Sequence, residues 1–157
     1  ALARRLVDQA LVVEDRREAW LRAGQRLCEA APPRPGVYRL VRDDGRVVYV
    51  GKANDIRRRL KAHFAARRWR AIGPGFARIV DGTWQVVGSE VEALVCEAEW
   101  IRRFEPLANV QVASPVLETR AIPRALVRDV MLVLPTADEG RVLLLGARVG
   151  GDLVRVE

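Results

Sequence analysis

Six polar side chains in the central part of the chain are of the types that hydrolyse phosphate esters. They combine two phenols, an ammonium, a guanidinium, an imidazole and one distant carboxylate: Tyr38, Tyr49, Lys52, Arg59, His63 and Glu97. Such groups can bind a phosphate, move a proton and hold Mg²⁺, which prefers oxygen ligands and needs only one or two carboxylates. The set therefore predicts metal-assisted hydrolysis of a phosphodiester bond.

The two tyrosines are predicted to lie on neighbouring strands of a β-hairpin. Two β-rich runs, 37–42 and 46–50, are joined by a segment that ends in Asp-Gly, which is a strong hairpin signal. If Asp-Gly is a two-residue turn, Tyr38 and Tyr49 fall on the same face as diagonal neighbours, whereas a three-residue turn would separate them. The opposite face would then carry Val37, Val41, Val48 and Val50.

A helix is expected from Asp55 to about Ala66, with Asn54 as its N-cap. The apolar stripe that it turns towards the sheet is Ile56, Leu60 and Phe64. Arg59 and His63 lie one turn apart beside this stripe, because side chains four residues apart share a helix face. The helix should therefore present both polar side chains to the sheet.

A second helix, 90–104, is predicted to begin with a capping box at Ser89. Its apolar stripe is expected to contain Leu94, Ile101 and Phe104, with Glu97 in the middle and with Glu92 and Glu99 on the opposite side. An unpaired carboxylate on a core-facing stripe is costly. Two explanations for Glu97 remain open: a buried ion pair with an arginine, or a metal ligand on the floor of a cleft.

The net charge of +7 is concentrated in the middle of the chain. Residues 57–78 contain eight basic side chains and no acidic one, whereas a merely solvated helix face usually mixes charges of both signs. We therefore expect a polyanionic partner. The side chains expected to bind nucleic acid are Arg57, Arg58, Lys61, Arg67, Arg68 and Arg70. No apolar run is long enough to span a membrane, and Cys28 and Cys96 are expected to be reduced thiols of a cytoplasmic protein.

The flanks carry no catalytic constellation. Residues 1–33 are expected to form a helical arm or linker in two segments, with the second opening near Glu14 or Asp15 and ending at the prolines that follow. A third strand is expected at 83–87. Residues 112–157 are expected to form a small β-rich appendage, with a hairpin around 136–140, which continues in a longer parent chain. The fold class is thus α+β, with a small three-stranded, mainly antiparallel sheet flanked by helices.

Residues 34–111 resemble the GIY-YIG nuclease domain, most closely the N-terminal nuclease domain of the bacterial excinuclease that makes the 3′-side incision in nucleotide excision repair. Gly36-Val37-Tyr38 and Tyr49-Val50-Gly51 stand where its two motifs belong, with valine for isoleucine. The other matches, in chain order, are Gly51-Lys52-Ala53, Arg59, His63, Glu92-Ala93-Leu94-Val95-Cys96-Glu97, Pro106 and Asn109. Glu105 and Ala108 depart from the pattern, and the flanks do not match.

The resemblance implies a DNA endonuclease of DNA repair, such as nucleotide excision repair, that uses one Mg²⁺ or Mn²⁺ ion. Glu97 would bind the metal, and Tyr38 would act as general base. The ordinary pKa of a phenol is near 10, so Lys52, Arg59 and the metal would have to favour the phenolate. Arg59 would also bind the scissile phosphate. Tyr49 and His63 would position water or phosphate, and Asn109 would hold the site together.

Two other function classes fit the same residues. One is a catalytically silent nucleic-acid-binding module of the same fold, although such a module should lose Tyr38 or Glu97 first. The other is an interaction domain whose basic patch binds an acidic protein, for which binding would not depend on salt as DNA binding does. Partners expected for the nuclease are DNA, further domains of a longer chain or a repair complex, and no membrane.

Overall fold

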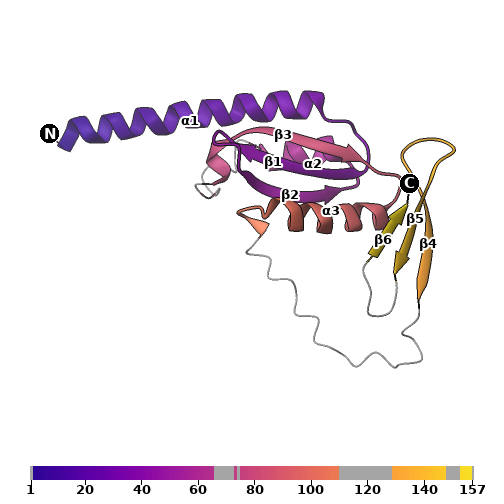
Figure 1. Cartoon of the computed structure of the whole chain (residues 1–157). Coiled ribbons are helices and arrows are strands. Elements are labelled where there is room, and N and C mark those ends of the chain that lie inside the picture. Colours follow the sequence, from indigo (N-terminus) through magenta and orange to yellow (C-terminus); the bar gives the residue numbers. More distant parts are fainter. Residues whose placement is uncertain (1, 66–72, 74, 110–128, 148–152, 157) are drawn as a thin grey trace.

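The structure is a computed structural model that describes residues 2–65, 73, 75–109, 129–147 and 153–156. Within them lie two separate three-stranded antiparallel sheets, of strand order β2-β1-β3 and β4-β5-β6 (Figure 1). The elements in chain order are α1 (Leu2–Ala30), β1 (Gly36–Arg42), β2 (Val47–Ala53), α2 (Ile56–His63), the 3-10 helix η2 (Phe76–Arg78), β3 (Ile79–Val86), α3 (Glu90–Phe104), β4 (Val130–Pro135), β5 (Val142–Ala147) and β6 (Leu153–Val156). The α+β prediction with a helix-flanked sheet is confirmed.

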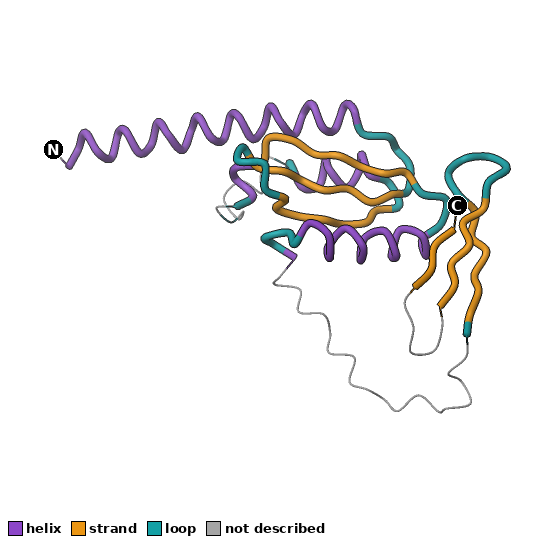
Figure 2. Tube along the Cα trace, in the orientation of Figure 1, coloured by secondary structure: helices purple, strands orange, loops and turns teal. Residues whose placement is uncertain are grey.

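The first sheet is covered by helices on both faces. Helices α1 and α3 lie on opposite sides of it, and α2 packs on the same side as α1 (Figures 1 and 2). The core under α1 and α2 contains Trp20, Leu27, Tyr38, Leu40, Val48, Ile56, Leu60, Phe64 and Ile79. The core under α3 is smaller and contains Val37, Val50, Val87, Ala93 and Cys96. Tyr38 thus stands on the central strand, in the larger core.

The hairpin turn has three residues, so the expected two-residue turn is wrong. Arg42 N–H donates to the Arg46 carbonyl at 2.9 Å, and Gly45 N–H donates to the Arg42 carbonyl at 2.9 Å. Gly45 has a φ of +79°, which glycine adopts without the steric cost that a Cβ would impose. A three-residue loop that ends in a left-handed residue is the next most common hairpin connection after the two-residue turns.

A β-bulge beside Leu40 restores the register that the turn would have shifted. Beyond it Leu40 lies opposite Tyr49 and Tyr38 lies opposite Gly51, as predicted. The bulge leaves Val48 as the extra residue of β2, and Val48 packs in the core of Tyr38 rather than on the α3 face where it was expected. The two tyrosines therefore share a face because the bulge offsets the three-residue turn, which the turn residues alone do not predict.

Helix α1 is one helix of 29 residues, so the two expected segments are wrong. The Glu14 side chain accepts from Arg17 at 2.9 Å, an i,i+3 pair inside a continuous helix rather than a cap. Its second half packs on the sheet through buried Trp20, Ala23 and Leu27. Among the described helices, none combines the length and the apolar character needed to cross a membrane.

Helix α3 begins at the predicted Ser89 cap, whose hydroxyl accepts from Glu92 N–H at 3.1 Å. The predicted stripe is partly wrong, because Leu94 is 49% exposed while Glu92 is only 4% exposed. The capping box explains Glu92: its carboxylate folds back onto Gly88 N–H at 2.8 Å, which shields it beside the helix terminus. Ala93 and Cys96 face the sheet instead of Leu94.

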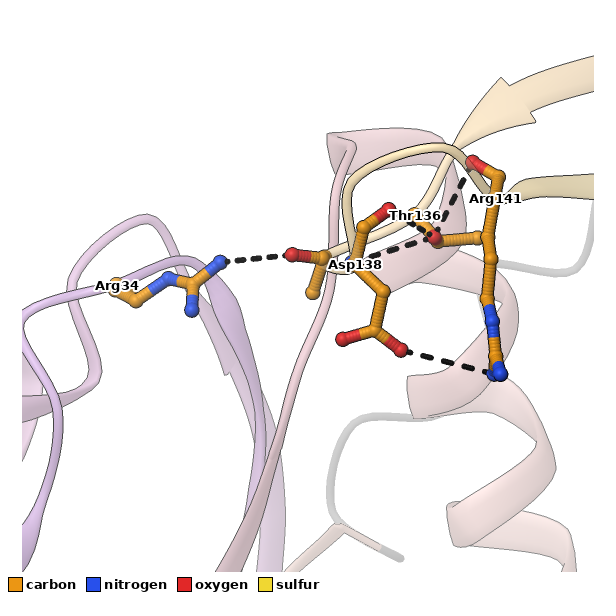
Figure 3. A network of polar contacts seen from close by, with 5 residues as sticks. Arg34, Thr136, Asp138 and Arg141 are labelled. Carbon is orange, nitrogen blue, oxygen red and sulfur yellow. Dashed lines mark hydrogen bonds and ion pairs between the residues drawn. The ribbon is translucent and has the colours of Figure 1, made fainter.

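The second sheet confirms the expected C-terminal strands, while residues 110–128 lie outside the described part of the chain. Its β4–β5 turn lies against the first sheet, where the Arg34 guanidinium donates to the Ala137 carbonyl at 3.2 Å (Figure 3). A Cβ at Gly88 would lie 2.3 Å from the Pro135 carbonyl oxygen, so glycine is needed for this approach. Strand β4 is an edge strand with exposed apolar side chains, Met131 at 72% and Val133 at 59%.

Candidate active site

The phenol of Tyr38 lies at the centre of the candidate site. Tyr38 stands on the central strand β1 and its side chain is fully buried. Its hydroxyl lies 2.7 Å from His63 Nε2, and Arg59 Nε donates to the same hydroxyl at 3.4 Å. Arg59 and His63 come from one face of α2, as their spacing predicted. The packing of Ile56 and Leu60 against the sheet turns that face inward.

Helix α2 is shorter than expected and begins one residue later. It spans Ile56–His63, and its N-cap is Asp55 rather than Asn54. The Asp55 carboxylate accepts from Arg58 N–H at 2.8 Å, while its backbone has extended dihedral angles. Asp55 is therefore the residue that satisfies the open first turn of the helix, a role that Asn and Asp side chains fill about equally well.

Aromatic rings surround the Tyr38 hydroxyl. The Tyr49 ring centroid lies 5.9 Å from that of Tyr38 and 5.3 Å from that of His63. Phe76 of η2 contacts Tyr49 at 5.9 Å and His63 at 6.4 Å between ring centroids. These contacts hold the imidazole against both phenol rings and limit its movement away from Tyr38.

Burial raises the pKa of Tyr38 well above its ordinary value, and the nearby Tyr49 phenol adds to the effect. The hydrogen bond and charge of Arg59 oppose this rise but do not cancel it. The same contact with Tyr38 raises the pKa of Arg59, which stays charged. Lys52 was expected to help form the phenolate, but its ammonium pairs with Glu90 at 3.0 Å instead. The protein groups alone therefore keep Tyr38 as a neutral phenol.

Glu97 lies beside this cluster, at the edge of the face that α3 packs on the sheet. Its Oε1 accepts from the backbone N–H of Lys52 at 3.0 Å, which fixes the carboxylate against the end of β2. Within the part of the chain that the structure describes, the partner of Glu97 is thus a main-chain N–H and not an arginine. This observation favours the second explanation for an acidic residue on a packed helix face, a ligand held ready for a cation.

A pocket of about 550 Å³ joins Glu97 to the other polar groups. Its walls are formed by the ends of β2, α2 and α3. The lining residues are Tyr49, Lys52, Ala53, Asn54, Asp55, Arg58, Arg59, Ala62, Glu90 and Glu97. Tyr38 and His63 do not line this pocket; Arg59, which does, connects it to Tyr38 through their hydrogen bond.

The donor set of the pocket suits a hard, hydrated cation. Among the described residues there is no cluster of three or more His, Cys, Asp or Glu side chains of the kind that encloses a zinc ion. Three carboxylates line the pocket, those of Asp55, Glu90 and Glu97, of which Asp55 caps α2. Mg²⁺ commonly binds one or two carboxylates while keeping several waters. One lone pair of Glu97 is used by Lys52 N–H, and a carboxylate has about four such sites.

Comparison with known proteins identifies the family of the central residues. Residues 34–110 match the family model of the UvrC-like GIY-YIG domain. These residues are a GIY-YIG domain. The site described above lies within them, since it extends from Tyr38 to Glu97.

Relatives of the GIY-YIG domain are much longer proteins. UvrABC system protein C of Mycobacterium tuberculosis (strain ATCC 25618 / H37Rv) is 46% identical over 85 residues, which are 51% of this chain and 13% of that protein. UvrABC system protein C of Tropheryma whipplei (strain Twist) is 38% identical over 104 residues, 61% of this chain and 17% of that protein. The chain thus spans less than a fifth of the relatives that it matches.

Solved structures of the N-terminal endonuclease domain of UvrC from Thermotoga maritima are also similar. The domain bound to its catalytic divalent cation, magnesium, is 26% identical with a TM-score of 0.43. The likeness covers 54% of this chain and 92% of that chain.

Asn109 of the GIY-YIG domain contacts the main chain rather than the pocket. Its amide donates to the Val50 carbonyl at 2.8 Å and its Oδ1 accepts from Val50 N–H at 2.9 Å. Leu107 and Ala108 donate their N–H groups to the carbonyls of Val47 and Val48. The segment after α3 thereby pairs with the outer edge of β2, the strand that carries Tyr49.

The basic residues expected to bind nucleic acid have different surroundings. Arg58 is exposed and lines the pocket, and Lys61 is exposed where α2 meets the end of α1, beside Cys28. Arg57 Nε instead donates to the Ala31 carbonyl at 2.7 Å, so this side chain joins α2 to the end of α1. The remaining three, Arg67, Arg68 and Arg70, lie outside the described residues.

Glu90 is a pocket residue that the sequence analysis did not identify. It is the first residue of α3 and lies 3.0 Å from the Lys52 ammonium. The capping box predicted its place on the helix but gave no signal for its partner. The contact depends on how α3 packs against the end of β2, which is a tertiary feature.

Proposed function

We propose that the GIY-YIG domain is a divalent-metal-dependent DNA endonuclease that hydrolyses phosphodiester bonds in DNA repair. The observation that supports it most is the direct contact of Tyr38 with both His63 and Arg59, next to a pocket that also contains Glu97. General acid–base groups, a phosphate-binding cation and a carboxylate for a metal are then adjacent. The family match supports the same reaction, because it covers all of these residues.

Glu97 is the proposed ligand of a single Mg²⁺ or Mn²⁺ ion. When bound, the ion supplies positive charge that stabilises the phosphoryl oxygens and the leaving 3′ oxygen. Glu97 is suited to this role because Lys52 N–H fixes one of its oxygens while its side chain faces the pocket. An ion of this kind needs few protein ligands, and the pocket offers few carboxylates.

Arg59 is the proposed ligand of the scissile phosphate, and Lys52 and Arg58 bind the flanking phosphates. All three side chains line the pocket. Arginine can form two parallel hydrogen bonds to a phosphate, which orients the group for in-line attack. Tyr49, in the same wall, orients the attacking water.

Tyr38 is the proposed general base. Its raised pKa means that it is a neutral phenol and not a phenolate, and His63 lets the neutral phenol act as a base by accepting its hydroxyl proton. As the water attacks phosphorus, it gives its proton to the Tyr38 hydroxyl oxygen. The hydroxyl proton of Tyr38 passes at the same time to His63 Nε2, 2.7 Å away, and the bond from phosphorus to the 3′ oxygen breaks. No free phenolate needs to form in this step. We take residues 34–111 as the catalytic domain, within a longer protein or a repair complex that binds DNA.

The test is a nicking assay on the chain as it stands, with supercoiled, flapped, bubbled and lesion-bearing DNA and with Mg²⁺ or Mn²⁺. Tyr38→Phe should lower kcat by about 10²- to 10⁴-fold, the usual range for a lost acid–base group. Glu97→Gln should also lower kcat, because it weakens binding of the metal ion, and DNA binding should persist in both variants. Glu99→Gln on the same helix is the matched control and should retain activity. Binding without cleavage by the wild type under all conditions would instead identify the catalytically silent module.

A further inference from the structure

The N-terminus of α2 depends on the segment that leaves α1. A helix begins with four N–H groups that have no acceptor within the helix. In α2 the first two donate to that segment: Ile56 N–H to the Arg34 carbonyl at 3.1 Å and Arg57 N–H to the Pro32 carbonyl at 3.3 Å. The next two are satisfied by Asp55, through its carboxylate and its carbonyl. The chain that follows α1 thus caps the helix carrying Arg59 and His63.

The other end of α2 packs directly against α1. Phe64 follows His63 and is 8% exposed. Its ring centroid lies 5.1 Å from that of Trp20, which is 2% exposed. Gly24, one helical turn beyond Trp20, lies so close that a Cβ there would be 2.5 Å from Phe64 Cγ. A third link is the Arg57 side chain, which donates to the Ala31 carbonyl at 2.7 Å.

We propose that α1 positions the catalytic helix α2, and that Trp20 and Gly24 are positioning residues for His63 and Arg59. This inference rests on the proposed function. Residues 34–110 match the GIY-YIG family, so α1 lies outside the matched segment and is an addition to it. The catalytic unit of this chain then extends back from residue 34 to about Trp20.

The distances explain why a small shift matters. His63 and Phe64 are adjacent, so any displacement of Phe64 moves the imidazole that lies 2.7 Å from the Tyr38 hydroxyl. A side-chain contact stretched to about 3.6 Å is no longer a hydrogen bond. A misplacement of about 1 Å can cost about 100-fold in rate. Substitutions at Trp20 and Gly24 disturb Phe64 in opposite ways. Loss of the Trp20 indole leaves a void beside the Phe64 ring, whereas a methyl group at Gly24 pushes against that ring.

The imidazole itself provides a readout that does not depend on activity. His63 is the single histidine of the chain, so its ¹⁵N–¹H correlation spectrum contains the signals of one ring. Trp20→Ala and Gly24→Ala should shift these signals away from those of the wild type at the same pH, because the bond to Tyr38 is disturbed. Leu27→Ala is the matched control: Leu27 is a buried residue of the same helix but packs against Gly82 of β3. It should lower stability and leave the imidazole signals in place.

Kinetics separates positioning from folding. In Trp20→Ala and Gly24→Ala, kcat should fall on the order of 10-fold or more, whereas KM for DNA should change less, since Lys52 lies on β2 and keeps its place. Trp20→Phe, which keeps an aromatic ring against Phe64, should recover most of kcat and serves if Trp20→Ala does not fold.

The proposal is overturned if the imidazole signals and kcat of both Trp20→Ala and Gly24→Ala follow those of Leu27→Ala at equal stability. If the wild type cleaves no DNA, the proposed function fails, while the spectra still decide whether α1 positions His63.

Discussion

Replacement of Asn109 tests how the last segment of the GIY-YIG domain holds strand β2. In Asn109→Ala both polar groups of Val50 lose their partner, and Val50 is fully buried. Each lost hydrogen bond of this kind costs about 1 kcal/mol, and more when the remaining group stays buried and unsatisfied. The expected loss is therefore about 2–4 kcal/mol of unfolding free energy. For a chain of 157 residues, this corresponds to a fall in Tm of about 5–15 °C.

Asn109→Asp gives the same test a pH dependence of known sign. The Asp carboxyl, when protonated, can donate to the Val50 carbonyl as the amide does, whereas the ionised form places an oxygen against that carbonyl. The pKa of the new group is therefore higher in the folded than in the unfolded state. Its stabilising contribution is present at low pH and is lost as the pH rises through the folded-state pKa.

The assay is urea unfolding of wild type, Asn109→Ala and Asn109→Asp at about pH 5 and about pH 8. Relative to the wild type, Asn109→Asp should lose stability between these two values, and Asn109→Ala should not change. Below the Tm, kcat of Asn109→Ala should fall much less than that of Tyr38→Phe. A loss of less than about 0.5 kcal/mol in Asn109→Ala would refute the reasoning, because that is the range of an ordinary surface substitution.

Three further results are expected. Glu90→Gln releases the Lys52 ammonium, so binding to DNA should tighten and become more salt-dependent, as measured by titration at several salt concentrations; an unchanged salt dependence would contradict this. Gly51→Ala should lower kcat, since a Cβ there would lie 2.6 Å from the Tyr49 ring and would displace it. In the double variant Gly51→Ala, Tyr49→Phe, kcat should not recover, because the ring that collides with the new methyl group is still present. Burial raises the pKa of Cys28, so its thiol should react slowly with iodoacetamide at neutral pH and faster as the pH rises; rapid labelling near pH 7 in the folded protein would show that the thiol is not shielded.

Local patterns predicted the parts of the site that depend on short-range geometry. The spacing of Arg59 and His63 on a helix was enough to place both towards the sheet, and the β-rich runs were enough to place Tyr38 on a strand. The shared face of Tyr38 and Tyr49 was predicted correctly from a turn that does not exist. The actual cause is the bulge at Val48, for which the sequence offers no distinctive signal.

The features that sequence reasoning missed depend on contacts between distant elements. The stripe on α3 was assigned by hydrophobicity alone, which favoured Leu94 over Glu92, but the capping box decided which of them is shielded. The pair formed by Lys52 and Glu90 requires the end of β2 to meet the start of α3. The packing of Trp20 on Phe64 requires α1 to run along the sheet, whereas the sequence predicted only a helical arm or linker for residues 1–33.

The bulge in the β1–β2 hairpin separates the loop at Gly45 from the part of the hairpin that carries Tyr38 and Tyr49. Strand β1 pairs with β3 as well as with β2, and Asn109 anchors β2 from its outer edge. The catalytic register is thus maintained by neighbours on both sides and does not depend on the length of the loop at Gly45. Residues could be inserted at that loop tip, where a glycine with open space around it now stands, without displacing Tyr38 or Tyr49. The tip is accordingly a suitable place for a fluorophore or a tethering group on this GIY-YIG domain.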